Sequence, residues 1–199
     1  MIAIITGDIV NSQKAKPEKW VIALESTLNQ YAGKDNWEIY RGDSFQAEIP
    51  VNNLFNALIG IKTAIKSIPP IDVRMGIGVG EKDYTNKSLT KSNGQALVFS
   101  GKVFDALKKE TLAIQTPWEE VNEQLNVILE LISFIMNDWN HNLSWLINQA
   151  LTHQDLAQVE LAEKLNKKQS QISRDLKRAG YEYILRTINY CQKTLSEKC

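Results

Sequence analysis

Residues 1–115 alternate between short β-branched runs and longer stretches in which apolar residues recur at helical spacing. Short apolar runs bounded by turn residues are typical of strands, and a period of about 3.6 residues is typical of amphipathic helices. The predicted strands span 2–5, 37–40, 44–49, 73–79 and 112–114, and the predicted helices span 17–33, 54–65 and 94–109. We therefore expect this part of the chain to fold as an α+β domain.

The order of these elements gives the domain its expected topology. Strand, helix, two strands, helix and strand in succession match a ferredoxin-like βαββαβ unit, an antiparallel sheet with helices on one face. A further helix and strand follow this unit. Thr116 and Pro117 mark its end, so we expect one domain over 1–116 and a second over 117–199.

Residues 117–199 are predicted to be helical throughout. The stretch 121–135 is strongly amphipathic, and Trp139, Trp145 and Leu146 continue its apolar spacing. Aromatic residues at such spacing favour a core or a helix–helix contact over a ligand site.

Charge is distributed unevenly, although the formal net charge is zero. Residues 116–163 carry eight acidic side chains and no Lys or Arg, whereas 164–186 carry seven basic and two acidic side chains. An acidic segment followed by a basic one indicates parts with different partners.

The remaining bulk properties favour a cytoplasmic protein that makes no contact with membranes. Cys191 and Cys199 form neither a disulfide framework nor a zinc pattern, which favours a reducing compartment. The first ten residues, MIAIITGDIV, lack the basic segment of a signal peptide, and no apolar run approaches the roughly 18 residues of a membrane span. We therefore do not expect Arg41-Gly42-Asp43 to act as a cell-adhesion tripeptide.

Residues 158–178, QVELAEKLNKKQSQISRDLKR, predict a helix-turn-helix. Apolar residues at helical spacing would line the inner sides of two short helices: Leu161, Ala162, Leu165, Ile172 and Leu176. Asn166 lies between the helices and tolerates the left-handed backbone of a tight turn. The outer side of the second helix would present Lys168, Gln169, Gln171, Ser173, Arg174 and Lys177.

These outer side chains suit duplex DNA. Gln and Arg bond base edges, while Lys and Ser bond phosphates. The basic segment adds a sequence-independent attraction to the DNA backbone. The alternative is an amphipathic helical pair that serves only as a dimer or partner surface.

Two carboxylates in the first part of the chain indicate a metal site. Asp8 follows the first predicted strand, and Asp43 lies in the turn of the predicted hairpin 37–49. In a βαββαβ sheet the first strand is central and pairs with that hairpin, so the two carboxylates could meet at one end of the sheet. Close carboxylates repel unless a proton or cation joins them, and Mg²⁺ prefers carboxylate and phosphate oxygens. The alternative is that both are turn or capping residues.

The first part of the chain resembles the catalytic domain of class III nucleotidyl cyclases and GGDEF diguanylate cyclases. The resemblance rests on GDIVNSQ at 7–13, IYRGDSF at 39–45, VRMGIGVG at 73–80 and GQALVFSGK at 94–102. It implies that Asp8 and Asp43 hold Mg²⁺ and that Ile9 lends its backbone carbonyl. It also implies a homodimer, because these cyclases complete their site across subunits.

The chain departs from the cyclases on the helix at 94–109. Val98 replaces the transition-state Asn and cannot bond ribose or phosphate, and Lys102 replaces the Arg and keeps only its charge. Lys102 is therefore the candidate catalytic residue if any transfer chemistry occurs, and it is also a candidate phosphate-binding cation.

Further residues near these motifs have two interpretations. Asn11 and Ser12 could cap the next helix or face a phosphate, and Arg41 could be a solvated turn residue or a phosphate ligand. Arg74 is expected to form a structural ion pair. The glycines at 76, 78 and 80 are expected to permit a close backbone approach.

Over its whole length the chain resembles the SatD family of small bacterial proteins. With the features above, this favours a bacterial cytoplasmic regulator that binds duplex DNA through 158–178 and a Mg²⁺–nucleotide or related phosphate ligand through 1–116. One alternative is a metal-dependent enzyme of nucleotidyl or phosphoryl transfer. A second is a non-catalytic scaffold for protein contacts.

Overall fold

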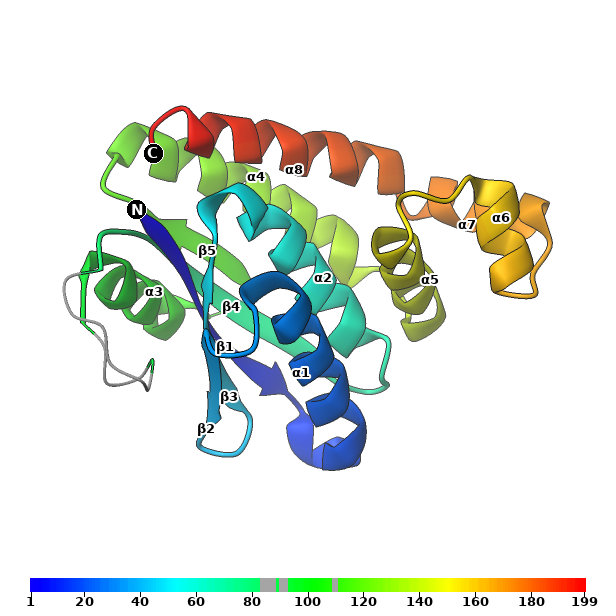
Figure 1. The fold of residues 1–199 in the computed structure, drawn as a ribbon, viewed down its shortest axis with the longest axis horizontal. Helices are drawn as coiled ribbons and strands as arrows, with labels where there is room; N and C mark the ends of the chain where they lie inside the picture. Colours follow the sequence, from blue (N-terminus) through cyan, green and yellow to red (C-terminus); the bar gives the residue numbers. More distant parts are fainter. Residues whose placement is uncertain (83–88, 90–92, 109–110) are drawn as a thin grey trace.

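A mixed five-stranded sheet in the order β2-β3-β1-β4-β5 forms the centre of the structure (Figure 1). The computed structural model describes residues 1–82, 89, 93–108 and 111–199. Neighbouring strands are antiparallel, except that β4 and β5 are parallel. The strands are β1 (Ile2–Val10), β2 (Trp37–Tyr40), β3 (Ser44–Ile49), β4 (Asp72–Gly80) and β5 (Leu112–Gln115).

Helices connect these strands and make up most of the C-terminal part. They are α1 (Pro17–Ala32), α2 (Leu54–Lys66), α3 (Gln95–Ala106), α4 (Glu119–Asn137), α5 (His141–Thr152), α6 (Gln158–Lys164), α7 (Gln169–Arg178) and α8 (Tyr181–Ser196). The predicted α+β class is confirmed. The predicted end of the third helix, Lys109, lies outside the described residues. No helix in the described part of the chain is long and apolar enough to cross a membrane.

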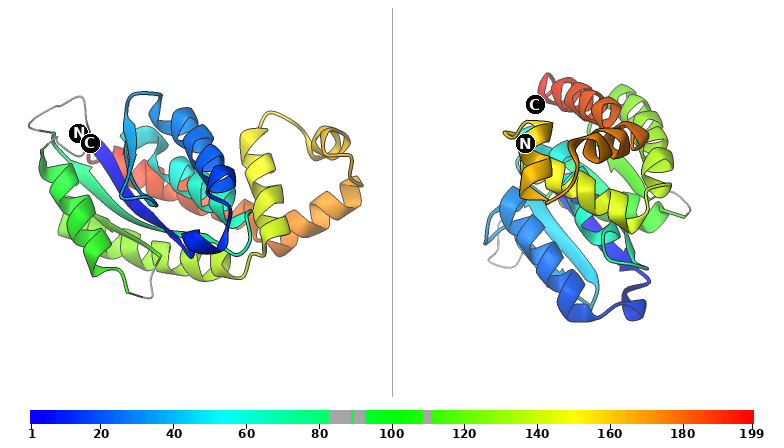
Figure 2. Two further views of the ribbon diagram at one scale, coloured as in Figure 1. Left: turned by 90° about the horizontal axis from the view of Figure 1, so that it is seen from below. Right: turned by 90° about the vertical axis from the view of Figure 1, so that its right-hand side faces the viewer.

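Helices cover both faces of the sheet: α1 and α2, the helices of the predicted βαββαβ unit, lie on one face, and the added helix α3 lies on the other. Ala3 and Ile5 of β1 pack into the core formed with α1 and α2, whereas Ile4 between them packs with Ala96 of α3. Figure 2 shows α3 on the opposite side of the sheet from α1 and α2. Within β1 to β4, neighbouring strands are antiparallel, as predicted for this unit, whereas the added strand β5 is parallel to β4. A parallel pair needs a crossover connection, and α3 is that connection.

The central strand β1 is longer than the sequence predicted. Gly7 and Asp8 were expected to end the strand, but β3 pairs with β1 as far as Asp8 and β4 pairs with it as far as Val10. Gly7 is not a turn residue. A Cβ atom there would lie 2.6 Å from the ring of Phe45, so the glycine makes room for this buried aromatic side chain.

Two glycines on β4 allow α3 to pack directly on the strand. A Cβ atom on Gly76 would overlap the backbone of Phe104, and one on Gly78 would overlap the backbone of Ala96 and Ser100. The expected close backbone approach is therefore present at both positions. It sets the distance between α3 and the sheet.

Helix α4 closes the outer edge of β5. The side-chain amide of Asn126 donates to the Ile114 carbonyl and accepts from the Ile114 N–H, both at 2.9 Å. Asn122, one helical turn earlier, forms the same pair of bonds with Thr116 at 2.7 and 3.1 Å. The two amides satisfy backbone groups that an edge strand would otherwise expose.

The hydrophobic core runs from the sheet into the C-terminal helices. One cluster of buried residues includes Ala3 on β1, Leu58 on α2, Leu129 on α4 and Ile188 on α8. The division of the chain at Thr116 and Pro117 into two domains stays a prediction.

Lys62 on α2 is a fully buried lysine. Its ammonium lies 2.7 Å from a carboxylate oxygen of Asp72, whose other oxygen lies 3.1 Å from Lys66. Burial lowers the pKa of Lys62, and Asp72 acts in the opposite direction. Asp72 thus compensates the charge that α2 brings into the core.

The close contact between α3 and β4 gives a direct stability test. Gly78→Ala should lower the free energy of unfolding by about 1–3 kcal/mol or more, because the added methyl overlaps the α3 backbone. Gly101→Ala, within α3, is the matched control, since nothing lies within 4 Å of its added Cβ. This change should instead raise the free energy of unfolding by up to about 1 kcal/mol. Urea denaturation measures both, and equal stabilities would contradict the close approach.

Candidate functional site

Most of the predicted ligand-binding residues gather where β1 ends. In the sheet register, Asp8 lies opposite Ser44 of β3 and opposite Arg74 of β4. The hairpin between β2 and β3 follows the same end of the strand, since the Ile9 N–H donates to the Asp43 carbonyl at 3.1 Å. Antiparallel pairing therefore brings residues from three distant parts of the chain to one end of the sheet.

Arg74 holds the Asp8 carboxylate with two hydrogen bonds. Its Nε donates to one oxygen at 3.0 Å and its Nη2 donates to the other at 2.5 Å. These bonds raise the pKa of the Arg74 guanidinium, which partial burial lowers. The guanidinium also lies 5.6 Å from the centre of the Phe104 ring. Arg74 is thus the ion-pair residue that the sequence indicated, and its partner is Asp8.

Ser12 orients the second carboxylate. Its hydroxyl donates to Asp43 Oδ2 at 2.6 Å. Ser12 and Asn11 were alternatively expected to cap the next helix, but α1 begins after Lys16 and no side chain caps it. Asn11 has a left-handed backbone, with φ of 60°, and its side chain makes no capping bond to the short 3₁₀ turn at Ser12–Lys14.

The hairpin turn places Arg41 in solvent. Arg41 and Gly42 have φ values of 52° and 88°, so both residues lie in the left-handed region. Neighbouring Tyr40 is partly buried, and this burial raises the pKa of its hydroxyl. Arg41 lowers that pKa, while Asp105, Glu38 and Asp8 raise it. The phenol is therefore neutral at physiological pH, at a site that carries charges of both signs.

The Ile9 carbonyl points toward the hairpin. In an antiparallel strand the N–H and C=O of one residue point to the same neighbour, and the Ile9 N–H bonds Asp43. Within the described chain, the Asp43 N–H makes no return hydrogen bond to this carbonyl. The Ile9 oxygen thus lies beside the two carboxylate residues as an additional hard donor.

Lys102 does not join this group. Ser100 of α3 is buried against the sheet, where its hydroxyl lies 3.0 Å from that of Thr6. Lys102 is two residues further along α3, which turns it by about 200° to the other side of the helix. Lys102 is exposed there, as is Val98. The two positions that depart from the cyclases therefore face solvent rather than Asp8.

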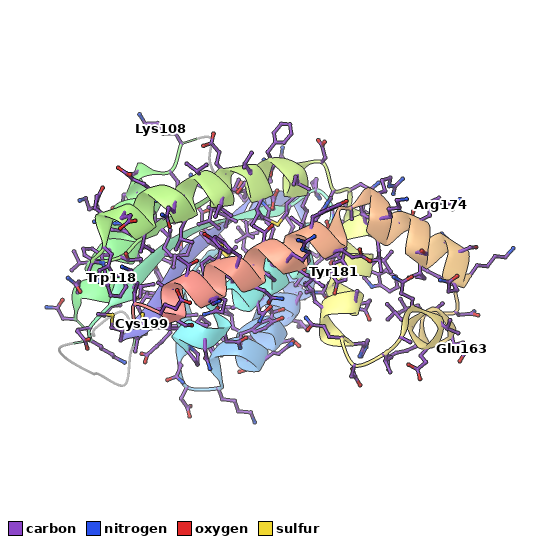
Figure 3. All side chains as sticks on the ribbon, turned by 90° about the horizontal axis from the view of Figure 1, so that it is seen from above. Lys108, Trp118, Glu163, Arg174, Tyr181 and Cys199 are labelled. Carbon is purple, nitrogen blue, oxygen red and sulfur yellow. The ribbon has the colours of Figure 1, made fainter. Side chains whose placement is uncertain are left out.

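The other predicted site residues lie at the end of the molecule remote from the two termini. Helices α6 and α7 pack through Leu161, Ala162, Ile172 and Leu176, which are buried. The opposite side of α7 carries the predicted polar residues: Lys168, Gln169, Arg174 and Lys177 are exposed, and Gln171 and Ser173 are half-buried. Figure 3 shows Arg174 projecting outward from α7.

The turn between α6 and α7 has the backbone that the sequence indicated. Asn166 is left-handed, with φ of 51°. The N–H of Lys167 donates to the Ala162 carbonyl at 2.9 Å, and that of Asn166 donates to the Glu163 carbonyl at 3.0 Å. This pair of bonds is the Schellman arrangement, which ends a helix sharply. The turn therefore fixes the direction in which α7 leaves α6.

Lys167 and Asp175, which do not fit a simple DNA-binding face, have partners within the protein. The Lys167 ammonium lies 5.6 Å from the centre of the Trp145 ring on α5. Asp175 lies 3.7 Å from Arg178, one turn further along α7. Trp145 was expected to be a core or interhelical residue, and it contacts this basic segment while remaining 37% exposed.

Two polar contacts, one in the core and one at the site, were not predicted from the sequence. Lys62 was not singled out, although its spacing four residues after Leu58 and three before Ile65 places it on the buried side of α2. Arg74 was not paired with Asp8. That pair depends on the register between β1 and β4, which no local pattern reveals.

Among the described residues, no three His, Cys, Asp or Glu side chains gather in a way that could hold a metal ion. A site of two carboxylates and a backbone carbonyl needs no third such side chain. The described residues thus define an α+β protein with two hydrogen-bonded carboxylates, Asp8 and Asp43, near the end of β1, and a basic helical face at the end of the molecule remote from the two termini (Figure 1).

Comparison with family models identifies its family. The model of the SatD family matches residues 1–195, so the chain belongs to the SatD family. A comparison with curated proteins gave no match.

The bidentate hydrogen bonding between Arg74 and Asp8 can be tested by a conservative substitution. Arg74→Lys should lower the free energy of unfolding by about 1 kcal/mol, because an ammonium cannot make both bonds of the guanidinium. Arg41→Lys is the matched control, since Arg41 is exposed in the hairpin turn. Thermal and urea unfolding measure the difference. A loss as large in the control variant would contradict the assignment.

Proposed function

We propose that this SatD family protein is a bacterial cytoplasmic regulator. Its α6–α7 pair binds duplex DNA as a helix-turn-helix, and the end of β1 binds Mg²⁺ together with a nucleotide or another phosphate ligand. The observation that carries the DNA-binding part is the division of α7 into a buried apolar side and an exposed basic and amide side.

The geometry of α7 supports this role. A recognition helix needs a fixed position on its partner helix and an outer side that reaches the major groove. Ile172 and Leu176 are buried and hold α7 in a fixed position on α6. The left-handed turn at Asn166 fixes the angle between the two helices. Gln169 and Arg174 suit base edges, and Lys168 and Lys177 suit phosphates.

Removal of charge from this side tests DNA binding. Arg174→Ala combined with Lys177→Ala should weaken binding to duplex DNA by about 10- to 100-fold. It should also lower the slope of log affinity against log salt concentration by about one or more, the effect of losing a phosphate contact. Lys34→Ala with Lys108→Ala removes the same charge from exposed positions remote from α7. Fluorescence anisotropy at several salt concentrations measures both variants.

If the α7 variant and the control bind DNA equally well, the attraction is a property of total charge and α7 is not the binding element. If neither the original protein nor any variant binds duplex DNA at low salt, the proposal that α6 and α7 bind DNA is wrong.

The end of β1 supports the ligand-binding part. We infer that the strand order β2-β3-β1-β4, with antiparallel neighbours, is a ferredoxin-like arrangement to which β5 is added. In it, Asp8, Asp43 and the Ile9 carbonyl offer hard oxygen donors of the kind that Mg²⁺ prefers. Asp43 keeps one carboxylate oxygen beyond the bond from Ser12, and Arg74 leaves each Asp8 oxygen a second lone pair.

The residues around this site favour binding over transfer chemistry. Within one protomer, Lys102 and Val98 lie on the solvent side of α3 and offer no group to stabilise charge developing beside Asp8 of the same chain. Nucleotidyl or phosphoryl transfer is the alternative. Chromatography of the nucleotide after incubation with the protein distinguishes the two, since a regulator returns the ligand unchanged.

Ligand binding should raise the melting temperature by mass action. With Mg²⁺ and ATP, GTP or a cyclic dinucleotide at about 100 times the dissociation constant, stabilisation should be about 2.7 kcal/mol. Asp43→Asn should abolish this shift while keeping an oxygen that accepts from Ser12. Asp35→Asn, at an exposed position, is the matched control and should keep it. A shift that survives Asp43→Asn would exclude the metal assignment.

A further inference from the structure

Helix α4 carries an apolar stripe on the side that faces away from the core. Val127, Leu131 and Phe134 recur at spacings of four and three residues and are 60%, 61% and 74% exposed. Such spacing places them on one side of the helix, opposite the buried residues that contact the sheet. Three exposed apolar side chains in a row indicate a surface that another element covers.

The neighbouring helix α8 carries an aromatic and basic stripe. Tyr183 and Tyr190 are 70% and 57% exposed, and Arg186 and Lys193 alternate with them on the same side. Tyr and Arg are the residues most enriched where proteins meet. Lys193 lies 3.8 Å from Glu197 on its own helix, an exposed pair that is worth little in water.

The two stripes have opposite charge. The sequence of α4 contains four acidic residues and no basic one, and Glu123 and Glu130 lie exposed beside its apolar stripe. Two copies of α4 would therefore repel one another, whereas α4 and α8 are complementary. Because both stripes belong to one chain, a second copy can supply the complement of each.

The positions of the two helices make this pairing symmetric. Helices α4 and α8 lie side by side and run in opposite directions (Figures 1 and 3). The Trp139 indole N–H donates to the Ala179 carbonyl at 3.1 Å. A residue of α4 and a residue of α8 that are equally many residues away from this contact therefore lie at about the same height along the helix axes. A two-fold axis that is parallel to the helices and lies between the two copies leaves every residue at the same height along the axis. Such an axis places α4 of one copy on α8 of the other.

At matching levels the side chains are compatible. In this arrangement Phe134 of one copy lies beside Tyr183 of the other, and Val127 of one copy lies beside Tyr190 of the other. Glu130 falls within about two residues, or about 3 Å along the helix, of Arg186. Apolar groups thus meet aromatic groups, and acidic groups meet basic ones.

We propose that the protein forms a two-fold symmetric homodimer in which α4 of each copy packs on α8 of the other. Two helices of this length cover a face of about 25 Å by 20 Å. Such a face, with side-chain relief, approaches the roughly 800 Å² that each partner buries in a standard interface. Both α7 helices then lie at the same end of the dimer, which, resting on the DNA-binding function proposed above, suits paired half-sites.

Light scattering and sedimentation equilibrium of the full chain, without DNA, test the dimer. The protein should have twice the chain mass at micromolar concentration. Phe134→Asp should raise the dissociation constant at least about 100-fold, because a carboxylate enters the centre of the interface. Val98→Asp introduces the same charge at a residue that is 59% exposed on α3, and it should leave the mass unchanged.

A charge exchange tests the partner helix directly. Glu130→Arg and Arg186→Glu should each weaken the dimer about 10-fold or more, and the double variant should recover to within a few-fold of the original. All substituted side chains are exposed, and circular dichroism checks that each variant is folded. A monomeric protein, a dimer unaffected by Phe134→Asp, or a double variant no tighter than the single ones would each overturn the proposal. DNA affinity is measured separately on the monomeric variant, so failure of the dimer and failure of DNA binding are distinguishable.

Discussion

The pairing of β1 with β3 on one side and β4 on the other is the constraint on which the candidate ligand site depends. The side chains of a strand alternate between two faces, so a slip by one residue would move Asp8 to the opposite face of the sheet. In the observed register, Asp8 lies opposite Arg74, and Ile9 bonds the hairpin at Asp43. The register itself is held by the large apolar side chains that the other face buries, including Ile5 and Phe45.

Close packing on both faces keeps this strand in place. On one face, Gly7 makes room for the Phe45 ring. On the other, Gly76 and Gly78 let α3 lie directly on β4. A directed chain of hydrogen bonds supports the same contact: Gln46 donates to Thr6, which lies 3.0 Å from Ser100, and Ser100 donates to the Leu97 carbonyl. The end of β1 extends beyond this contact, which is why its polar residues can meet a ligand.

The sequence predicted the elements well and their spatial relations only in part. Local patterns sufficed for the helices, for the left-handed Asn166 and for the buried residues of α6 and α7, because their causes lie within a few residues. Three features depend on distant partners: the extension of β1 through Gly7, the pairing of Arg74 with Asp8, and the amides of Asn122 and Asn126 on the edge of β5. The position of α3 also escaped prediction, since it depends on where β5 joins the sheet.

The cation site that we propose at the end of β1 would lie between Asp8, Ile9 and Asp43. Nuclear magnetic resonance with trace Mn²⁺ in place of Mg²⁺ tests it most directly, because the ion broadens the amide signals nearest to it. We expect selective loss of signals from residues 8–12 and 41–44, reversal by excess Mg²⁺, and no loss in Asp43→Asn. Broadening confined to other regions, or equal broadening in Asp43→Asn, would exclude a cation site at the end of β1.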